Sequence, residues 1–279
     1  MTDYKVIKGH YHVRRYAPDG DSIRFKAEDH TNWDFFTWEN SSEKAKAKKQ
    51  LRLEVIDALE THYQGFRQPH AFAIAALETL LSILGITGIK YNIAVTRIIE
   101  ANDEKPGYIV SSTVDTFNRP VSFAFGNIDG LNDGATIQGD EIPIERSINY
   151  IIARDGLAYP TYYSGIEDSI REKFTKVIED ARMNRRGIWA IDRTHGFTLG
   201  DKDTIQSDII IMPKLFRRLV SFFLNRVDYD DFMNFMKDNP DPVQKVSDGT
   251  KTNLHELIVN EGRFYKLEVR PEMLIFIPK

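Results

Sequence analysis

The stretch from residue 51 to residue 60, LRLEVIDALE, constrains this chain more than any other. In residues 51–55, leucine and valine alternate with arginine and glutamate, the period-two pattern of a half-buried strand. Two carboxylates, Asp57 and Glu60, follow where the strand should give way to a loop, a place where scaffolds present chemistry. Asp57 has the opposite parity to Arg52, so the strand must end, bulge or turn near Ile56 if these side chains are to converge. Alone, the pattern fits a salt-bridged edge strand equally well.

Composition limits the classes of protein that need be considered. The chain has 279 residues, enough for one large domain or a domain with an added module. A net charge of −4 gives no overall electrostatic case for nucleic acid, so any basic surface must be local. The absence of cysteine excludes disulfides, thiolate nucleophiles and Cys-ligated zinc. Residues 1–5 lack an apolar signal core, and no apolar run approaches the roughly 18 residues of a membrane span, so we expect a soluble cytoplasmic protein without a membrane partner.

The order of turn signals and apolar patterns predicts two domains. Residues 1–192 should form the first domain, and residues 195–279 a small α+β accessory domain. In the first we expect strands at 11–16, 22–25, 91–99, 108–114 and 121–125, and helices at 70–84, 144–155 and 166–184, with Gly187 as the left-handed cap of the last. In the second we expect a strand at 208–212, helices at 214–227, 229–237 and 254–261, and a terminal hairpin of residues 264–269 and 273–278.

Three segments carry alternatives. Residues 30–50 combine an aromatic cluster with four lysines, which would suit nucleic acid, but a solvated basic helix beside a small satellite core is favoured. Residues 127–141 are rich in aspartate and glycine but lack EF-hand spacing, so a surface loop is expected. The apolar face of the helix at 214–227 must be buried; the domain's own core is favoured over a protein partner or self-association.

Five side chains together point to phosphodiester chemistry: Asp21, Arg52, Asp57, Glu60 and Arg119. Carboxylates and backbone carbonyls suit a hard cation such as Ca²⁺, with Mg²⁺ or Mn²⁺ as alternatives. Two arginines suit a phosphate, which they can bind through bidentate hydrogen bonds. A further glutamate suits a general base that activates or orients water.

The same residues lie in motifs that resemble the staphylococcal nuclease (thermonuclease) family over residues 11–191. The resemblance is carried by five short motifs in order: Asp19-Gly20-Asp21-Ser22-Ile23, the stretch from Leu51 to Glu60, Asn118-Arg119-Pro120, Ala153-Arg154-Asp155-Gly156-Leu157-Ala158, and Arg186-Gly187-Ile188-Trp189. It implies a five-stranded OB-fold barrel with three helices. It also implies a metal (Ca²⁺)-dependent nuclease that hydrolyses DNA and/or RNA.

Roles follow from the resemblance position by position. Arg52 and Arg119 would bind the scissile phosphate, and Glu60 would activate water. The metal ligands would be Asp21, Asp57 and the backbone oxygen of Ala58, with Asp19 in the outer shell, and Tyr162 would bind substrate. Ala58 and Leu59 replace the threonine and proline usual in the family, so Glu60 lacks the stiffening of a proline. The alternative is a non-catalytic module of the same fold that binds nucleic acid or protein.

Overall fold

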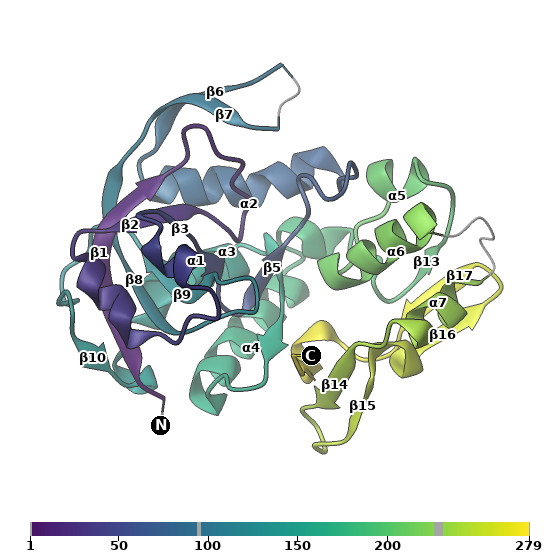
Figure 1. Cartoon of the computed structure of the whole chain (residues 1–279). Coiled ribbons are helices and arrows are strands. Elements are labelled where there is room, and N and C mark those ends of the chain that lie inside the picture. The colour runs from purple at the N-terminus through teal and green to yellow at the C-terminus, as the bar shows by residue number, and fades with distance from the viewer. Residues whose placement is uncertain (1, 94–95, 226–230, 279) are drawn as a thin grey trace. The chain divides into compact units, whose positions relative to one another are not determined.

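The computed structural model describes residues 2–93, 96–225 and 231–278 (Figure 1). The chain divides into two compact units made of interleaved segments. Unit 1 comprises Met1–Glu54, Ala76–Ile152 and Glu167–Lys173, and unit 2 comprises Val55–Ala75, Ala153–Ile166 and Phe174–Lys279. Residues 195–279 therefore belong to unit 2 together with the earlier residues 55–75, 153–166 and 174–194.

Unit 1 is built around a sheet that curls into a nearly closed barrel (Figure 1). Neighbouring strands follow the order β3-β2-β1-β8-β9-β4, and β10 adds to β1. All pairs are antiparallel except β4 with β9. The strands are β1 (Tyr4–His12), β2 (Arg24–Ala27), β3 (Lys49–Gln50), β4 (Arg52–Leu53), β8 (Lys105–Val114), β9 (Pro120–Phe125) and β10 (Thr136–Ile137). The expectation of a barrel is thus confirmed in this coarser form.

The barrel closes through residues 49–53. β3 pairs with β2 at one end of the strand order, β4 pairs with β9 at the other, and only Leu51 separates the two. The Leu51 amide donates to the Ile23 carbonyl at 2.8 Å, and the Leu53 amide donates to the Asp21 carbonyl at 2.8 Å. Both ends of the strand order are therefore pieces of one short stretch, so the six labels describe five stretches of chain.

The interruption expected near Ile56 lies one residue earlier. Val55 has φ of 75°, in the left-handed region that a β-branched residue rarely adopts. The Glu54 amide donates to the Ser122 carbonyl at 2.9 Å in unit 1, and the Val55 carbonyl accepts from the Thr161 amide at 2.6 Å in unit 2. The chain then continues as β5 (Ile56–Ala58), which pairs antiparallel with β11 (Ala158–Pro160) in unit 2.

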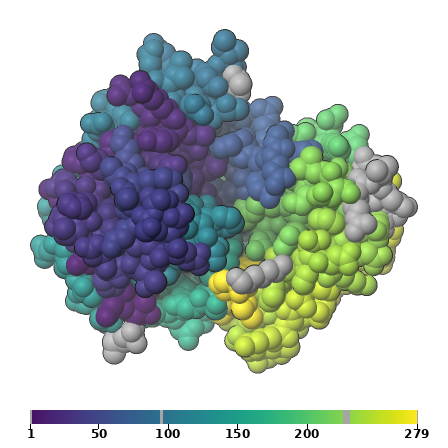
Figure 2. All heavy atoms as spheres, in the orientation of Figure 1, coloured from purple at the N-terminus to yellow at the C-terminus, as the bar shows by residue number. Residues whose placement is uncertain are grey.

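Three helices are divided between the two units, and short insertions complete unit 1. The helices expected at 70–84, 144–155 and 166–184 form as α2 (His70–Ile83), α3 (Ile148–Arg154) and α4 (Asp168–Met183). The remaining elements are η1 (His30–Phe35), α1 (Ser41–Ala45), β6 (Thr87–Tyr91), β7 (Ile98–Asn102), η2 (Gly139–Glu141) and η3 (Ile144–Arg146). Residues 30–50, dark indigo in Figure 2, cover much of the visible face of this unit.

One lysine of this insertion has a structural task. The Lys49 ammonium donates three hydrogen bonds of 2.5 to 2.7 Å. Its nitrogen lies over the Trp38 ring, 4.7 Å from the ring centre. Burial lowers the pKa of Lys49 from 10.5 to about 8. The acceptors are carbonyls at the end of α1, those of Glu43, Lys44 and Lys46. Lys49 therefore caps a helix and anchors the satellite core; it is buried, unlike the solvated lysines expected for this segment.

Unit 2 contains two further sheets. The first has the order β12-β18-β14-β15, and the second has the order β13-β17-β16. The apolar residues of α6 are buried, apart from the exposed Leu224 near its end, as expected of a helix covered by the chain's own core. The elements are β12 (Tyr162–Tyr163), η4 (Gly187–Ala190), β13 (Phe197–Thr198), α5 (Thr204–Ser207), α6 (Pro213–Asn225), α7 (Phe232–Asp238), β14 (Pro242–Lys245), β15 (Lys251–Asn253), η6 (Leu254–Leu257), β16 (Ile258–Glu261), β17 (Phe264–Leu267), η7 (Pro271–Met273) and β18 (Leu274–Phe276).

Several expected strands and helices are wrong in detail. The lead-in strand expected at 11–16 ends at His12 as β1, and the strand expected at 91–99 is the tip of the β6–β7 hairpin, where residues 94–95 lie outside the described residues. Residues 209–212 are buried but form no strand, and of the helices expected at 214–227 and 229–237, residues 226–230 also lie outside the description. Residues 254–261 form a 3₁₀ turn and then a strand, because their apolar spacing of three and four needs only a single turn.

The last two strands of the chain pair differently from the hairpin expected from the sequence. β17 pairs with β13 and β16, whereas β18 pairs with β12 and β14, so the two do not form the expected hairpin. At the end of α4, the left-handed residue that caps the helix is Arg185; Gly187 also has a left-handed φ, 52°, but lies two residues further along. Gly187 is needed for another reason: a Cβ there would lie 2.2 Å from the Gly156 carbonyl oxygen.

Candidate functional site

Three of the expected site residues gather at one edge of the barrel in unit 1. β4 carries Arg52, which is in register with Val121 of β9, two residues after Arg119. On the other side of β4, the Asp21 carbonyl accepts the Leu53 amide at 2.8 Å. Arg52 therefore lies between the Asp21 turn and the turn that carries Arg119, as the sequence hypothesis requires.

The aspartates before β2 lie in a tight turn. The amide of Asp19 donates to the Ser22 carbonyl at 3.1 Å, and the amide of Ser22 donates back to the Asp19 carbonyl at 3.2 Å. Asp19 and Asp21 are both half-buried. The turn fixes their backbones, so both the turn role and the predicted metal-binding role are compatible with it.

Arg119 is engaged by a carboxylate of its own turn. Its Nε donates to Asp115 Oδ2 at 2.8 Å, and its terminal nitrogen lies 2.7 Å from the same oxygen. The guanidinium lies over the Phe117 ring at 5.4 Å. Its side chain keeps 31% of its surface exposed, so the guanidinium is held in one orientation while part of it still faces solvent.

The other candidate residues lie in unit 2, beginning with Asp57 and Ala58 on β5. Asp57 is in register with Tyr159 and Ala58 with Ala158. Asp57 is only 3% exposed, an unusual burial for a carboxylate, which requires a positive charge or several hydrogen-bond donors nearby. Pairing of β5 with β11 thus carries a carboxylate into the interior of unit 2.

The loop after β5 is braced by a buried glutamine. The Gln68 amide donates to the Glu60 carbonyl at 2.9 Å, and the Glu60 amide donates to Gln68 Oε1 at 3.2 Å. Gln68 is fully buried, and its Nε2 donates to the Ile211 carbonyl at 2.8 Å. Glu60 is therefore fixed by Gln68 where a proline fixes the loop in the resembled family.

The charge that Asp57 and Glu60 require comes from α6. Arg217 forms a two-pronged contact with Asp57, with nitrogen–oxygen distances of 3.1 and 2.7 Å. The nitrogen that makes the longer bond also donates to Glu60 Oε1 at 2.5 Å. The two carboxylates therefore converge on one guanidinium nitrogen. The three side chains are 26% exposed for Arg217, 5% for Asp57 and 12% for Glu60, so water screens the contact only partly.

Electrostatics hold this arginine firmly charged. Burial acts to lower the pKa of Arg217, but the carboxylates of Asp57 and Glu60 outweigh burial and hold that pKa well above its ordinary value. Sequence reasoning missed Arg217 because it lies 160 residues from Asp57. The only available signal was a buried-strand carboxylate that needed a cation.

Tyr162, expected to bind substrate, lies in the core of unit 2. It is fully buried, and its hydroxyl lies 2.8 Å from Thr175 Oγ1 on α4. Its backbone belongs to β12, which pairs with β18. The Tyr162 side chain is not exposed to solvent in this conformation, so its substrate-binding role stays a prediction.

The carboxylates do not fit Ca²⁺, Mg²⁺ or Mn²⁺ in the arrangement they adopt. Both oxygens of Asp57 and one of Glu60 accept bonds from a guanidinium, whose charge would repel a divalent cation at the same oxygens. Across the described ranges, no group of three or more His, Asp or Glu side chains is disposed to hold a metal. Arg217 satisfies the charge that the predicted metal would have satisfied.

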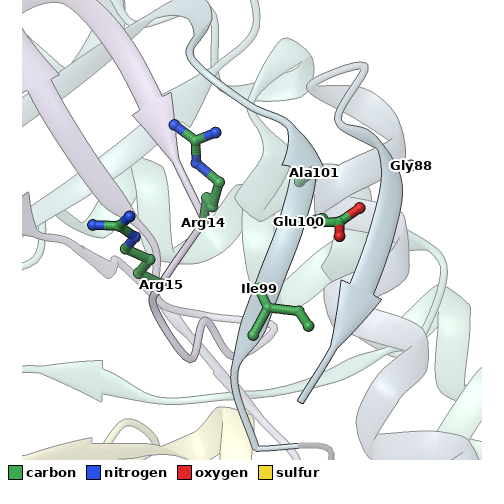
Figure 3. Close-up of a pocket in the computed structure, with 6 residues that line it drawn as sticks. All are labelled: Arg14, Arg15, Gly88, Ile99, Glu100 and Ala101. Atoms are coloured by element: carbon green, nitrogen blue, oxygen red, sulfur yellow. The ribbon is translucent and has the colours of Figure 1, made fainter.

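A separate hollow lies in unit 1 (Figure 3). It measures about 390 Å³ and is lined by Arg14 and Arg15, which follow β1, and by the residues 99–101 of β7 and Gly88 of β6. Its walls are exposed arginines on one side and Glu100 on the other, and the Glu100 carboxylate lies 2.6 Å from Lys90. It contains none of the residues expected to bind or cleave a substrate.

Comparisons with known proteins leave the resemblance resting on the motifs themselves. No family model matches the sequence, and no curated protein matches it either. None of the helices within the described ranges is long and apolar enough to cross a membrane.

Proposed function

We propose that this chain is a nuclease of the staphylococcal type, built on an OB-fold barrel, that hydrolyses phosphodiester bonds of DNA and/or RNA. The observation that carries the proposal is the convergence of Asp57 and Glu60 on a single positively charged nitrogen at the exit of β5. Two carboxylates brought together at a strand exit are groups that metal-assisted phosphodiester hydrolysis uses, one as a metal ligand and one as a base. The placement of Arg52 between the Asp21 and Arg119 turns supports the same proposal.

The residues have distinct tasks in the proposed reaction. Arg52 and Arg119 bind the phosphate and stabilise the charge that grows on its oxygens. Glu60 accepts a proton from water as the water oxygen forms its bond to phosphorus. The phosphorus–oxygen ester bond breaks on the opposite side, and the leaving oxygen takes a proton from solvent. Ca²⁺ is the proposed cofactor, but no step is assigned to it because Asp57, one of its expected ligands, is held by Arg217.

The test is a digestion panel of single- and double-stranded DNA and RNA, in Ca²⁺ and in EDTA. We expect cleavage in Ca²⁺ that EDTA abolishes, and a loss of at least about 100-fold in Glu60→Gln, the magnitude typical of a missing general base. Glu256→Gln is the matched control, because Glu256 is an exposed glutamate whose described contacts are all local, with Thr252, Asn253 and His255. Undiminished cleavage by Glu60→Gln would remove Glu60 from the mechanism.

A second candidate function is a non-catalytic module that binds nucleic acid or protein. The observation that favours it is again Arg217, because a permanent internal cation would leave Asp57 and Glu60 with a purely structural role. Binding of single-stranded DNA without cleavage of any of the four substrates, at saturating Ca²⁺, would favour this module over the nuclease.

A further inference from the structure

The segment that supplies Arg217 lies far from the barrel motifs in sequence but is tied firmly to the carboxylate loop within unit 2. α6 packs against β5. Just before α6, the Ile211 carbonyl accepts the Gln68 side chain at 2.8 Å, and the Gln206 side chain accepts the Arg67 amide at 3.3 Å. Arg217 therefore approaches Asp57 and Glu60 from a helix held in place by independent contacts.

The two neighbouring arginines of α6 serve different partners. Arg218 forms its own two-pronged contact with Asp241, at 2.6 and 2.5 Å, while Arg217 serves only the candidate-site carboxylates in the contacts described. Asp241 is nearly buried, with 5% of its side chain exposed, and so is Asp57. The two pairs are alike in geometry and burial and differ in which carboxylate they neutralise.

We infer that Arg217 is a built-in competitor of the metal, which blocks the candidate site until its guanidinium leaves Asp57 and Glu60. This inference rests on the proposed function, and it concerns regulation of that same site. A guanidinium and a divalent cation are both positively charged groups that bind carboxylate oxygens, and they cannot bind the same oxygens at the same time. The apparent Ca²⁺ affinity is then the intrinsic affinity multiplied by the fraction of molecules in which Arg217 is withdrawn from the carboxylates.

The test is calorimetric titration of the full chain with CaCl₂, comparing the wild type with Arg217→Gln. If Arg217 is paired in 90 to 99% of molecules, removing it should tighten Ca²⁺ binding by about 10- to 100-fold. Arg218→Gln is the matched control, since it breaks an equally buried two-pronged pair on the same helix and should leave Ca²⁺ affinity unchanged. Equal or weaker binding by Arg217→Gln, or equal tightening by Arg218→Gln, would overturn the inference.

Folding of the variant must be checked because Arg217→Gln leaves a buried carboxylate without its cation. If circular dichroism shows that it is unfolded, Arg217→Lys provides the measurement. A lysine keeps the charge but loses the two-pronged geometry, so Ca²⁺ should still bind more tightly than to the wild type. Unchanged or weaker binding by a folded Arg217→Lys variant would equally refute the competition.

Cleavage assays on the same proteins separate this inference from the proposed function. Tighter Ca²⁺ binding by Arg217→Gln without cleavage of any nucleic acid would sustain the competition and reject the nuclease. Cleavage by the wild type with unchanged Ca²⁺ affinity in Arg217→Gln would sustain the nuclease and reject the competition. Lower cleavage by Arg217→Gln at unchanged Ca²⁺ affinity would identify Arg217 as a phosphate-binding residue and would also reject it.

Discussion

A second arginine, Arg182 on α4, offers the sharpest test of how unit 2 is held together. Its terminal nitrogens lie 2.8 Å from Glu272 and 3.3 Å from Asp192, and its guanidinium carbon lies 3.9 Å from the centre of the Trp189 ring. Glu272 is fully buried, and its other carboxylate oxygen has no hydrogen-bond partner among the described residues. Arg182 therefore supplies the only described ion-pair partner of a carboxylate that water does not reach.

The Arg182→Met variant keeps the apolar stem but leaves Glu272 charged and unpaired. Breaking one side of a buried pair costs about 3–5 kcal/mol of unfolding free energy, which dominates the cation–π loss over Trp189. With a urea dependence of about 2–3 kcal/mol per molar, the midpoint should fall by roughly 1–2 M. The double variant Arg182→Met/Glu272→Met should recover at least half of this loss, since an apolar pair often replaces a buried ion pair at little cost.

The measurement is urea unfolding followed by circular dichroism and Trp fluorescence. Arg171→Met on the same helix is the control: its partner Asp168 is 81% exposed, so this pair should contribute about 0–1 kcal/mol. A loss below about 1 kcal/mol in Arg182→Met, or a double variant no more stable than the single one, would refute the electrostatic reasoning.

Two further predictions concern the Lys49 cap and the glycine contact after α4. Burial lowers the pKa of Lys49 from 10.5 to about 8, so between these pH values the unfolded chain binds more protons than the folded chain. The Lys49 contribution to the unfolding free energy should therefore rise as the pH increases from 8 to 10.5. Urea unfolding at several pH values measures this rise when the wild type is compared with Lys49→Met, and an identical pH dependence in the two proteins would contradict it. Gly187→Ala should lower the melting temperature more than Gly262→Ala, because both glycines have similar φ, 52° and 57°, but only the first places a Cβ 2.2 Å from a backbone oxygen. Equal losses would show that conformation alone, not the contact with Gly156, requires glycine at 187.

Local patterns were sufficient to predict the three helices and several strands, whereas the barrel was expected only from the family resemblance. The alternation in residues 51–55 and the turn at 115–120 both depend on neighbours within a few residues, and both are present in the structure. The parity argument between Arg52 and Asp57 even located the break, which falls at Val55. What the alternation did not reveal is that this short stretch forms both ends of the strand order.

Pairing in the last third of the chain could not be predicted in the same way. β18 pairs in parallel with β12, more than 100 residues earlier, as the register of Tyr162 with Ile275 shows. A parallel partner at that separation leaves no local turn signal, so the nearest strand, β17, was the natural but wrong choice. The glycine at 262 carries the local signal for the hairpin that does form, β16 with β17.

Arg217 shows where reasoning from residue inventory reaches its limit. Of the two carboxylates after the 51–55 strand, Asp57 was expected to bind a metal ion and Glu60 to activate water. In the structure, the Arg217 guanidinium supplies the positive charge at Asp57. Arg217 lies on α6, whose sequence indicated only an apolar face and a polar face. Nothing in that polar face distinguished Arg217 from Arg218, which turns to Asp241 instead. A cation was expected at Asp57, while the packing of α6 against β5 determines that this cation is a guanidinium and that it also binds Glu60.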